Sequence, residues 1–176
     1  MTNDPMKLIQ SLIRDVPDFP KPGILFKDIS PLLSSAEGFG SCINLMAKAA
    51  APLKPHIIAG PEARGFIFGT PLALELGIGF VPIRKRGKLP WKTIEESYEL
   101  EYGTDTLQMH EDAVGTGQRV LLVDDLLATG GTMAACVRLV EKAGAEVVGT
   151  SFVIELGFLK GRSLLGDLAI KSLIQY

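Results

Sequence analysis

The stretch VLLVDDLLATGGT, residues 120 to 132, decides how the rest of the chain is interpreted. It begins with an aliphatic run, which is typical of a strand buried on both faces of a sheet. Two adjacent carboxylates, Asp124 and Asp125, follow this run, and a loop of small and hydroxyl residues comes next. If the run is a central strand, the carboxylates emerge at its carboxyl end, where α/β sheets bind their ligands.

Predicted strands and helices alternate on both sides of this stretch. We expect strands at 56–60, 78–83, 119–125, 146–156 and 170–176, and helices at 5–15, from Ser34 or Ser35 to about Ala50, at 62–76 and at 131–143. Residues 98–103 and 105–110 suggest a two-stranded excursion. Continuous aliphatic strands alternating with helices predict an α/β fold, with a mostly parallel central sheet flanked by helices on both faces.

Composition sets limits on the class of protein. The 176 residues suit one domain, and 47% hydrophobic with 22% charged residues is ordinary for a globular protein. A net charge of -2 argues against a general nucleic-acid binder. No apolar run reaches the roughly 18 to 20 residues of a membrane span, and the N-terminus lacks the apolar region of a signal peptide, so we expect a cytoplasmic protein. Cys42 and Cys136 are expected to be buried free thiols.

The loop after the predicted central strand has the chemistry of a phosphate site. The N-terminus of a helix offers unpaired N–H groups, and Ala128, Thr129, Gly130, Gly131 and Thr132 leave room for a phosphate to approach them. The loop lacks the lysine of a GxxxxGK[ST] motif, and the chain has no GxGxxG motif. Alternatives are an ordinary glycine-rich turn, or a receiver-type fold in which an aspartate is phosphorylated.

The stretch resembles the phosphoribosyl-diphosphate signature of the type I phosphoribosyltransferases. Three further stretches narrow the resemblance to the adenine-specific members: FPKPGILFKDISPLL (19–33), GPEARGFIFGTPLALELGIGFVPIRKRGKLP (60–90) and SYELEYGTDTLQMH (97–110). The four motifs occur in the order and spacing of the family and span nearly the whole chain. The resemblance implies one domain over residues 1–176, with a hood and base-binding segment at about 1–33 and a flexible flap at about 84–103.

The resemblance also implies a donor substrate, 5-phosphoribosyl 1-diphosphate, and a site for each of its parts. The 128–132 loop would bind the 5-phosphate, and Asp124 and Asp125 would bind the ribose hydroxyls, with Mg²⁺ held near them through substrate or water. Ala63 and Arg64 match the diphosphate-binding loop, in which a non-proline cis peptide would fall at Glu62–Ala63. From the residues alone, Glu62 and Arg64 are equally well explained as a charged first turn of a helix.

The run RKRGKLPWK (84–92) contains five of the eighteen basic residues. A solvated loop is the usual meaning of such a run. In the family context, Arg84, Lys85 and Lys88 would close over the diphosphate and exclude water. Glu101 matches the family's acidic residue near the base, where it would exchange a proton with adenine, and Tyr102 beside it would contact the substrate. The alternative for Glu101 is one more exposed glutamate.

Selection of the base is expected in GILFKDIS (23–30). Phe26 would stack on the purine, while the backbone of Leu25 and Lys27 would read the six-amino edge. The chain has Lys27 where arginine is more usual, and a backbone contact survives this difference. His56, His110 and Trp91 receive no functional role.

The resemblance therefore implies a Mg²⁺-dependent enzyme of purine salvage that converts adenine and 5-phosphoribosyl 1-diphosphate to AMP and diphosphate. The family resemblance further implies a homodimer. Two alternatives remain open from the sequence: a phosphoribosyltransferase for another purine base, and a non-catalytic regulator that senses the same metabolite.

Overall fold

The computed structural model describes residues 4–99 and 103–176. The chain divides into two compact units, Met1–Leu45 and Met46–Tyr176, and the boundary falls inside helix α3 (Ala36–Ala50). The first unit is longer than the N-terminal segment expected at about 1–33.

The first unit contains two short helices and a hairpin. These are α1 (Pro5–Ser11), β1 (Arg14–Pro17), β2 (Leu25–Asp28) and α2 (Ser30–Ser34), followed by the first part of α3. The prediction of a helix over 5–15 was wrong at its C-terminal end, because residues from Arg14 pair antiparallel with β2. The β2 partners of Arg14 and Asp15 lie more than ten positions further along the chain, so the pairing does not alter the helical periodicity of residues 5–15 from which the helix was predicted. Ser35 is the predicted cap of α3: its hydroxyl oxygen accepts the N–H of Gly38 at 3.1 Å.

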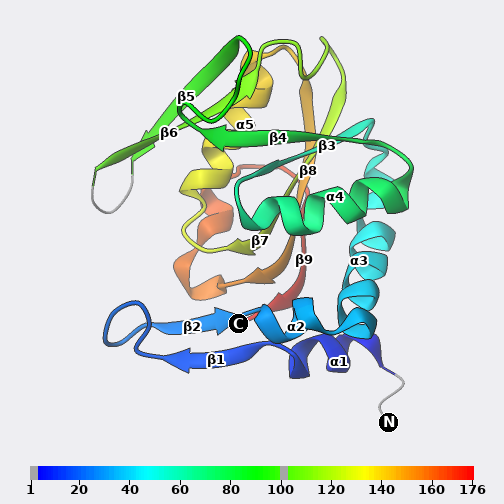
Figure 1. The fold of residues 1–176 in the computed structure, drawn as a ribbon, viewed down its shortest axis with the longest axis vertical. Coiled ribbons are helices and arrows are strands. Elements are labelled where there is room, and N and C mark those ends of the chain that lie inside the picture. Colours follow the sequence, from blue (N-terminus) through cyan, green and yellow to red (C-terminus); the bar gives the residue numbers. More distant parts are fainter. Residues whose placement is uncertain (1–3, 100–102) are drawn as a thin grey trace. The chain divides into compact units, whose positions relative to one another are not determined.

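The second unit is built on a seven-stranded sheet in the order β5-β6-β4-β3-β7-β8-β9 (Figure 1). The strands are β3 (Ile57–Pro61), β4 (Gly79–Lys85), β5 (Thr93–Glu99), β6 (Thr104–His110), β7 (Arg119–Leu127), β8 (Glu146–Glu155) and β9 (Ile170–Gln175). The five strands from β4 to β9 run parallel, whereas β6 is antiparallel to β4 and β5 is antiparallel to β6. The helices are α4 (Arg64–Leu76) and α5 (Gly131–Lys142), with short 3-10 turns η1 (Ala51–Leu53), η2 (Gly157–Leu159) and η3 (Gly161–Leu164). The predicted α/β class is confirmed.

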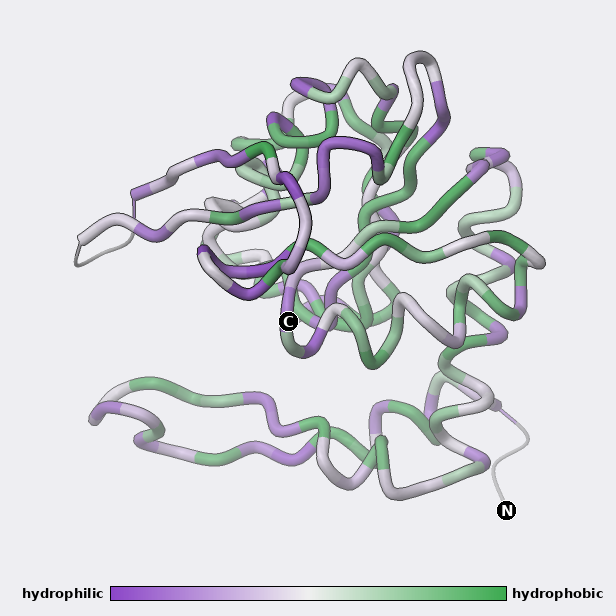
Figure 2. Tube along the Cα trace, turned by 45° about the horizontal axis from the view of Figure 1, so that its top comes forward, coloured by the Kyte–Doolittle hydropathy of each residue, from purple (hydrophilic) through white to green (hydrophobic). Residues whose placement is uncertain are grey.

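The central strand β7 lies between β3 and β8, and its residues 120 to 123 are all fully buried. Side chains of β4, β6 and α5 pack against it in one hydrophobic core. Hydrophobic residues therefore follow the central strands, whereas the β5–β6 hairpin projects from the sheet and is more hydrophilic (Figure 2). This hairpin is the predicted two-stranded excursion, and its first strand begins earlier than expected, at Thr93. Much of the stretch expected to act as a flap is therefore regular strand.

Two smaller expectations concern the thiols and the membrane. Cys42 and Cys136 are both free and buried, as predicted. Within residues 4–99 and 103–176, every helix is too short or too polar to cross a bilayer.

Candidate active site

Strand β7 continues past the point where its pairing with β3 ends. The pairing of β3 with β7 stops at Leu122, whereas β8 pairs with β7 as far as Leu127. The strand predicted at 119–125 continues to Leu127, because β8 runs alongside it, so Asp124 and Asp125 lie within the strand, two residues before its end. Both lie beyond the last residue of β7 that pairs with β3, so one edge of β7 is unpaired at the two carboxylates.

Small residues bring the first turn of α4 close to this open edge. A Cβ atom on Gly60 or Gly65 would lie only 2.8 or 2.9 Å from the carbonyl oxygen of Val123. A Cβ on Gly65 would also be 3.4 Å from Oδ1 of Asp124. Glycine at these positions therefore permits the close approach that places the loop before α4, with its cis Glu62–Ala63 peptide, beside the carboxylates.

The loop from Ala128 to Thr132 forms the start of α5. Gly130 is the N-cap residue, with a positive φ of 88°, and it has no side chain that could cap the first amides of the helix. A cavity of about 170 Å³ opens at this loop, and its wall also includes Arg64 and Asp124. A helix N-terminus that faces a cavity without a capping side chain is suited to bind an anion.

The segment after β8 supports this loop from the other side. A Cβ on Gly130 would lie 2.5 Å from the carbonyl oxygen of Gly161, and a Cβ on Gly161 would collide with Ala128. In addition, the N–H of Leu156 donates to the carbonyl of Leu127 at 2.9 Å. The loop is therefore fixed by backbone packing against η3, a contact that the sequence did not reveal.

A buried carboxylate anchors η3 in turn. Glu155 is only 3% exposed, and it accepts hydrogen bonds from Nε and a terminal nitrogen of Arg162 at 2.5 and 2.6 Å. The hydroxyl of Ser172 donates to the same carboxylate at 2.7 Å. The hydrogen bonds from Arg162, together with that from Ser172, hold the pKa of Glu155 below its usual value.

This network predicts a pH-dependent loss of stability in the variant Glu155→Gln. Because the pKa of Glu155 is lower in the folded than in the unfolded protein, its stabilisation is present above the unfolded pKa and is lost as the pH falls. We expect the Tm of the variant to be lower than that of the parent by about 4 to 8 °C at pH 7. The difference should shrink as the pH falls below about 4 in thermal melts. A constant difference between pH 3 and pH 7 would contradict the ionic role of Glu155.

The two carboxylates of β7 have different surroundings. Asp125 is 3% exposed, and its Oδ2 lies 3.1 Å from Nε of Arg64. Asp124 accepts the N–H of Asp125 at 2.8 Å, and it lines the cavity described above. Burial raises the pKa of both carboxyls, and for Asp124 the charge of Asp125 adds to the rise. Asp125 therefore holds Arg64, while Asp124 faces the cavity.

A second cavity, of about 290 Å³, adjoins the first. Its lining contains Glu62, Ala63, Arg64, Lys85, Tyr98, Asp105, Leu107, Asp124 and Thr132. Three of these residues, Arg64, Asp124 and Thr132, also line the first cavity. The hydroxyl of Thr132 donates to that of Tyr98 at 3.4 Å, which joins the β5–β6 hairpin to α5.

The basic run 84–92 is paired rather than loose. Its ion pairs are Arg84 with Glu62 (3.2 Å), Lys85 with Asp105 (2.9 Å), Arg86 with Glu95 (2.7 Å) and Lys92 with Glu111 (3.8 Å). Glu62 also accepts the backbone N–H of Lys85 at 2.6 Å. Glu62 is therefore a bridge to β4 and not part of the first turn of α4, which begins at Arg64. No ion pair involves Lys88 among the described residues.

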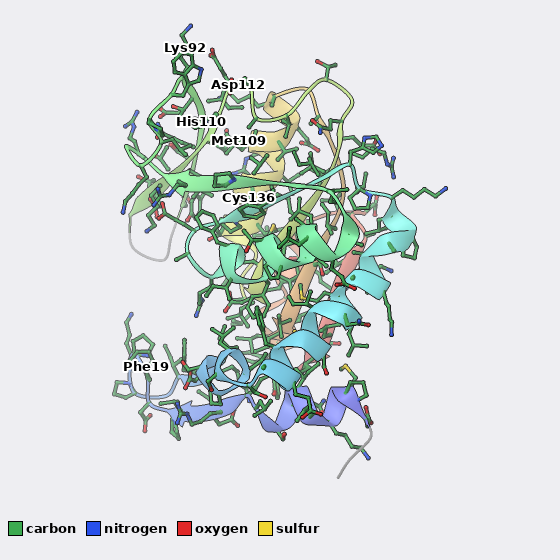
Figure 3. All side chains as sticks on the ribbon, turned by 45° about the vertical axis from the view of Figure 1, so that its right-hand side comes forward. Phe19, Lys92, Met109, His110, Asp112 and Cys136 are labelled. Carbon is green, nitrogen blue, oxygen red and sulfur yellow. The ribbon has the colours of Figure 1, made fainter. Side chains whose placement is uncertain are left out.

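The expected base-binding residues Leu25, Phe26 and Lys27 form most of β2. Within the first unit, a cavity of about 260 Å³ is lined by Val16, Phe19, Phe26 and Asp28. The ring of Phe19 meets that of Phe26 edge-on, with 5.1 Å between centroids. Phe19, which is labelled in Figure 3 and half-exposed, was not among the predicted site residues. The ammonium of Lys27 is 2.6 Å from Asp15, so its side chain is bound within the hairpin.

Two predicted site residues, Glu101 and Tyr102, lie outside the described residues. His110, labelled in Figure 3, accepts the N–H of Trp91 at 3.4 Å, and Nδ1 of His56 accepts that of Arg119 at 3.3 Å. These contacts fit the structural roles expected of both histidines.

Comparison with known proteins identifies the family. The phosphoribosyl transferase domain family matches residues 38–164. An adenine phosphoribosyltransferase of Desulfitobacterium hafniense is 57% identical over 164 residues, which are 93% of this chain and 95% of that relative. The chain belongs to the adenine phosphoribosyltransferase family.

Solved structures of the adenine phosphoribosyltransferase family share the fold. The enzyme of Thermoanaerobacter pseudethanolicus is 55% identical with a TM-score of 0.94, and the match covers 97% of this chain and 99% of that one. The Saccharomyces cerevisiae enzyme, in a complex with adenine and an imino-altritol bisphosphate, is 40% identical with a TM-score of 0.90, covering 96% and 98%. The resemblance inferred from four motifs is thus confirmed at the level of the adenine phosphoribosyltransferase family.

Proposed function

We propose that the protein transfers the 5-phosphoribosyl group of 5-phosphoribosyl 1-diphosphate to adenine, giving AMP and diphosphate in purine salvage. The observation that carries this proposal is the wall shared by two cavities, made of Arg64, Asp124 and Thr132. A ribose with a phosphate at one end and a diphosphate at the other needs two neighbouring anion sites with hydroxyl acceptors between them. The relatives named adenine phosphoribosyltransferase support the same substrates.

Each cavity would bind one end of the donor. In the smaller one, the amides of the 128–132 loop would hold the 5-phosphate, aided by the positive end of the α5 dipole. In the larger one, Ala63, Arg64 and Lys85 would hold the diphosphate, with Arg84 and Lys88 close in the chain. The ribose hydroxyls would donate to Asp124 at the shared wall. Asp125 would contribute by orienting Arg64, to which it is paired.

The charges of the larger cavity fit a substrate that arrives with Mg²⁺. Its lining has three carboxylates, from Glu62, Asp105 and Asp124, and two cations, from Arg64 and Lys85. These cations alone do not balance a diphosphate. Among the described residues, no three carboxylate, histidine or cysteine side chains are arranged to hold a metal ion by themselves. Asp124, with Asp125 behind it, would therefore hold the ion together with substrate oxygens. When bound, Mg²⁺ neutralises diphosphate charge and favours its departure.

The reaction is a dissociative displacement at the anomeric carbon with inversion. Binding at both ends fixes the sugar, and the leaving diphosphate carries its new charge toward Arg64 and Lys85. Closure of the 84–103 segment over the donor would keep water from an oxocarbenium-like sugar. Glu101 would exchange a proton with adenine as its N9 bonds to the sugar.

Selection of adenine would fall to β2. Phe26 would stack on the purine, and its ring is already fixed by the edge-on contact with Phe19. The backbone of Leu25 and Lys27 would donate to N1 of the base and accept from N6. A 6-oxopurine presents the opposite pattern and would leave buried polar groups unpaired.

The test is an assay of nucleotide formation with 5-phosphoribosyl 1-diphosphate, Mg²⁺ and one base at a time. We expect AMP from adenine, with guanine and hypoxanthine converted at least about 100-fold more slowly. Faster conversion of an oxopurine would support the alternative of another purine base. Binding of the donor without turnover of any base would support a metabolite-sensing regulator.

The variant Glu101→Gln tests the proton-transfer role. Because the amide cannot exchange the proton, we expect kcat to fall by about 100-fold while KM for adenine changes little. Glu99→Gln, which removes an exposed carboxylate on the same hairpin, is the matched control and should keep its rate. An unchanged kcat in the Glu101 variant would rule out this role.

The proposal includes a homodimer in the cytoplasm, as the family resemblance suggests. Sedimentation at micromolar concentration would test the dimer: a single species of the monomer mass of 18.9 kDa would contradict it.

A further inference from the structure

An ion pair stands inside the cavity proposed for the diphosphate. Nζ of Lys85, at the end of β4, lies 2.9 Å from Oδ2 of Asp105, near the start of β6. Both residues line the 290 Å³ cavity, and their side chains are 57% and 22% exposed. The second oxygen of Asp105 accepts the N–H of Thr106 at 2.8 Å. Both oxygens of Asp105 are thus bonded, and the pair is open to a ligand.

Of the three carboxylates in this cavity, Asp105 is the one to which neither a structural contact between segments nor a substrate contact has been assigned. Glu62 joins the loop before α4 to β4 through the N–H of Lys85 and through Arg84. Asp124 stands at the wall shared with the phosphate cavity. Among the described residues, Lys85 is the one side chain that bonds to the Asp105 carboxylate. A carboxylate so placed in an anion site opposes the ligand that the site is meant to bind.

We propose that Lys85 exchanges between Asp105 and the diphosphate, and that Asp105 thereby weakens diphosphate binding and speeds its release. The inference rests on the proposed function, since it concerns the leaving group of that reaction. Asp105 is a positioning residue in this scheme: it holds the ammonium at the cavity wall when the site is empty, and it takes the ammonium back when the product leaves.

The physical basis is a competition between two anions for one flexible cation. The lysine ammonium is a compact charge on a flexible stem, so it moves between partners without a large rearrangement. A partly exposed ion pair is worth no more than about 1 kcal/mol, which a diphosphate can overcome. Bound diphosphate must then also tolerate the carboxylate left behind. The hydrogen bond between the two groups lowers the pKa of Asp105 and raises that of Lys85, so both are charged at neutral pH.

The variant Asp105→Asn tests the exchange by the direction in which the affinity for diphosphate changes. It removes both the competing partner and the repelling charge, so diphosphate should bind more tightly, whereas loss of a merely structural ion pair would leave its affinity unchanged or weaker. By calorimetric titration with inorganic diphosphate and MgCl₂, we expect Kd to fall by about threefold to tenfold. Inhibition of AMP formation by diphosphate should strengthen by a similar factor.

Two controls separate the local effect from a change in net charge. Glu111→Gln also removes one negative charge and one lysine ion pair, but outside the cavity lining, and its Kd should match that of the parent. In a Lys85→Ala background, Asp105→Asn should have a smaller effect, because the exchanging cation is gone. Asp105→Ala repeats the test if the asparagine variant folds poorly.

The result that would overturn the inference is an unchanged or weaker affinity for diphosphate in a folded Asp105 variant. This failure is distinct from failure of the proposed function, which would appear as no AMP formation by the unmodified protein. If AMP is formed and the Asp105 variants bind diphosphate no more tightly, only the exchange is wrong.

Discussion

Replacing Arg64 with alanine should lower the rate of AMP formation by about 100-fold to 1000-fold, the usual effect of removing a donor aimed at developing charge. Arg64 lines both cavities, so its guanidinium would face the diphosphate and the ribose of the proposed donor complex. Its Nε is held by Asp125, which orients the remaining donors. Steady-state kinetics should show the loss mainly in kcat.

Arg138→Ala is the matched control for this variant. The side chains of Arg64 and Arg138 are 46% and 48% exposed, and each pairs with a carboxylate, in the second case Glu96 at 2.7 Å. Arg138 lies outside both cavities of the proposed donor site, so its loss should leave kcat within about threefold of the parent. Equal activity in the two variants would remove Arg64 from the leaving-group site.

Gly130→Ala should have an effect of similar size through the 5-phosphate. The new Cβ would lie 2.5 Å from the carbonyl oxygen of Gly161, at a residue whose φ is 88°. Since neither backbone segment can yield without opening the loop, the amides at the start of α5 should no longer converge on a phosphate. We expect AMP to bind at least about 100-fold more weakly by calorimetry, and AMP formation to fall in parallel.

Gly117→Ala separates the phosphate site from backbone strain in general. Gly117 also has a positive φ, 72°, but a Cβ there would meet no atom within 4 Å. This control should lose about 1 to 2 kcal/mol of stability and keep its affinity for AMP. Normal AMP binding in Gly130→Ala would show that the phosphate lies elsewhere.

Local sequence signals predicted much of the fold. Aliphatic runs marked the strands, Ser35 marked the start of α3, and the helix predicted at 131–143 ends one residue earlier, at Lys142. These signals act over a few residues, so they are readable without knowing what the segment packs against. The 5–15 helix was overextended because β1 depends on pairing with β2. The strand predicted at 119–125 was two residues too short because the length of β8 was unknown.

The sequence indicated which residues form the candidate site, but not which of them contact one another. Motif resemblance indicated Arg64, Lys85, Asp124 and the 128–132 loop, and the structure places them around two adjoining cavities. The pairing of Arg64 with Asp125 and the support of Gly130 by Gly161 join segments far apart in sequence. Such contacts follow from the tertiary fold, so no local pattern could predict them. Phe19 was missed for the same reason.

The reactivity of the two buried thiols can be used to measure how often the interior of each unit becomes exposed. Cys42 lies in the first compact unit and Cys136 in the second, so each unit has one reporter. Burial raises the pKa of Cys42 to about 12 and that of Cys136 further, which keeps both as unreactive thiols in the closed protein. Alkylation rates at the two sulfurs, resolved by mass spectrometry, would therefore report how often each unit exposes its interior, without any engineered label.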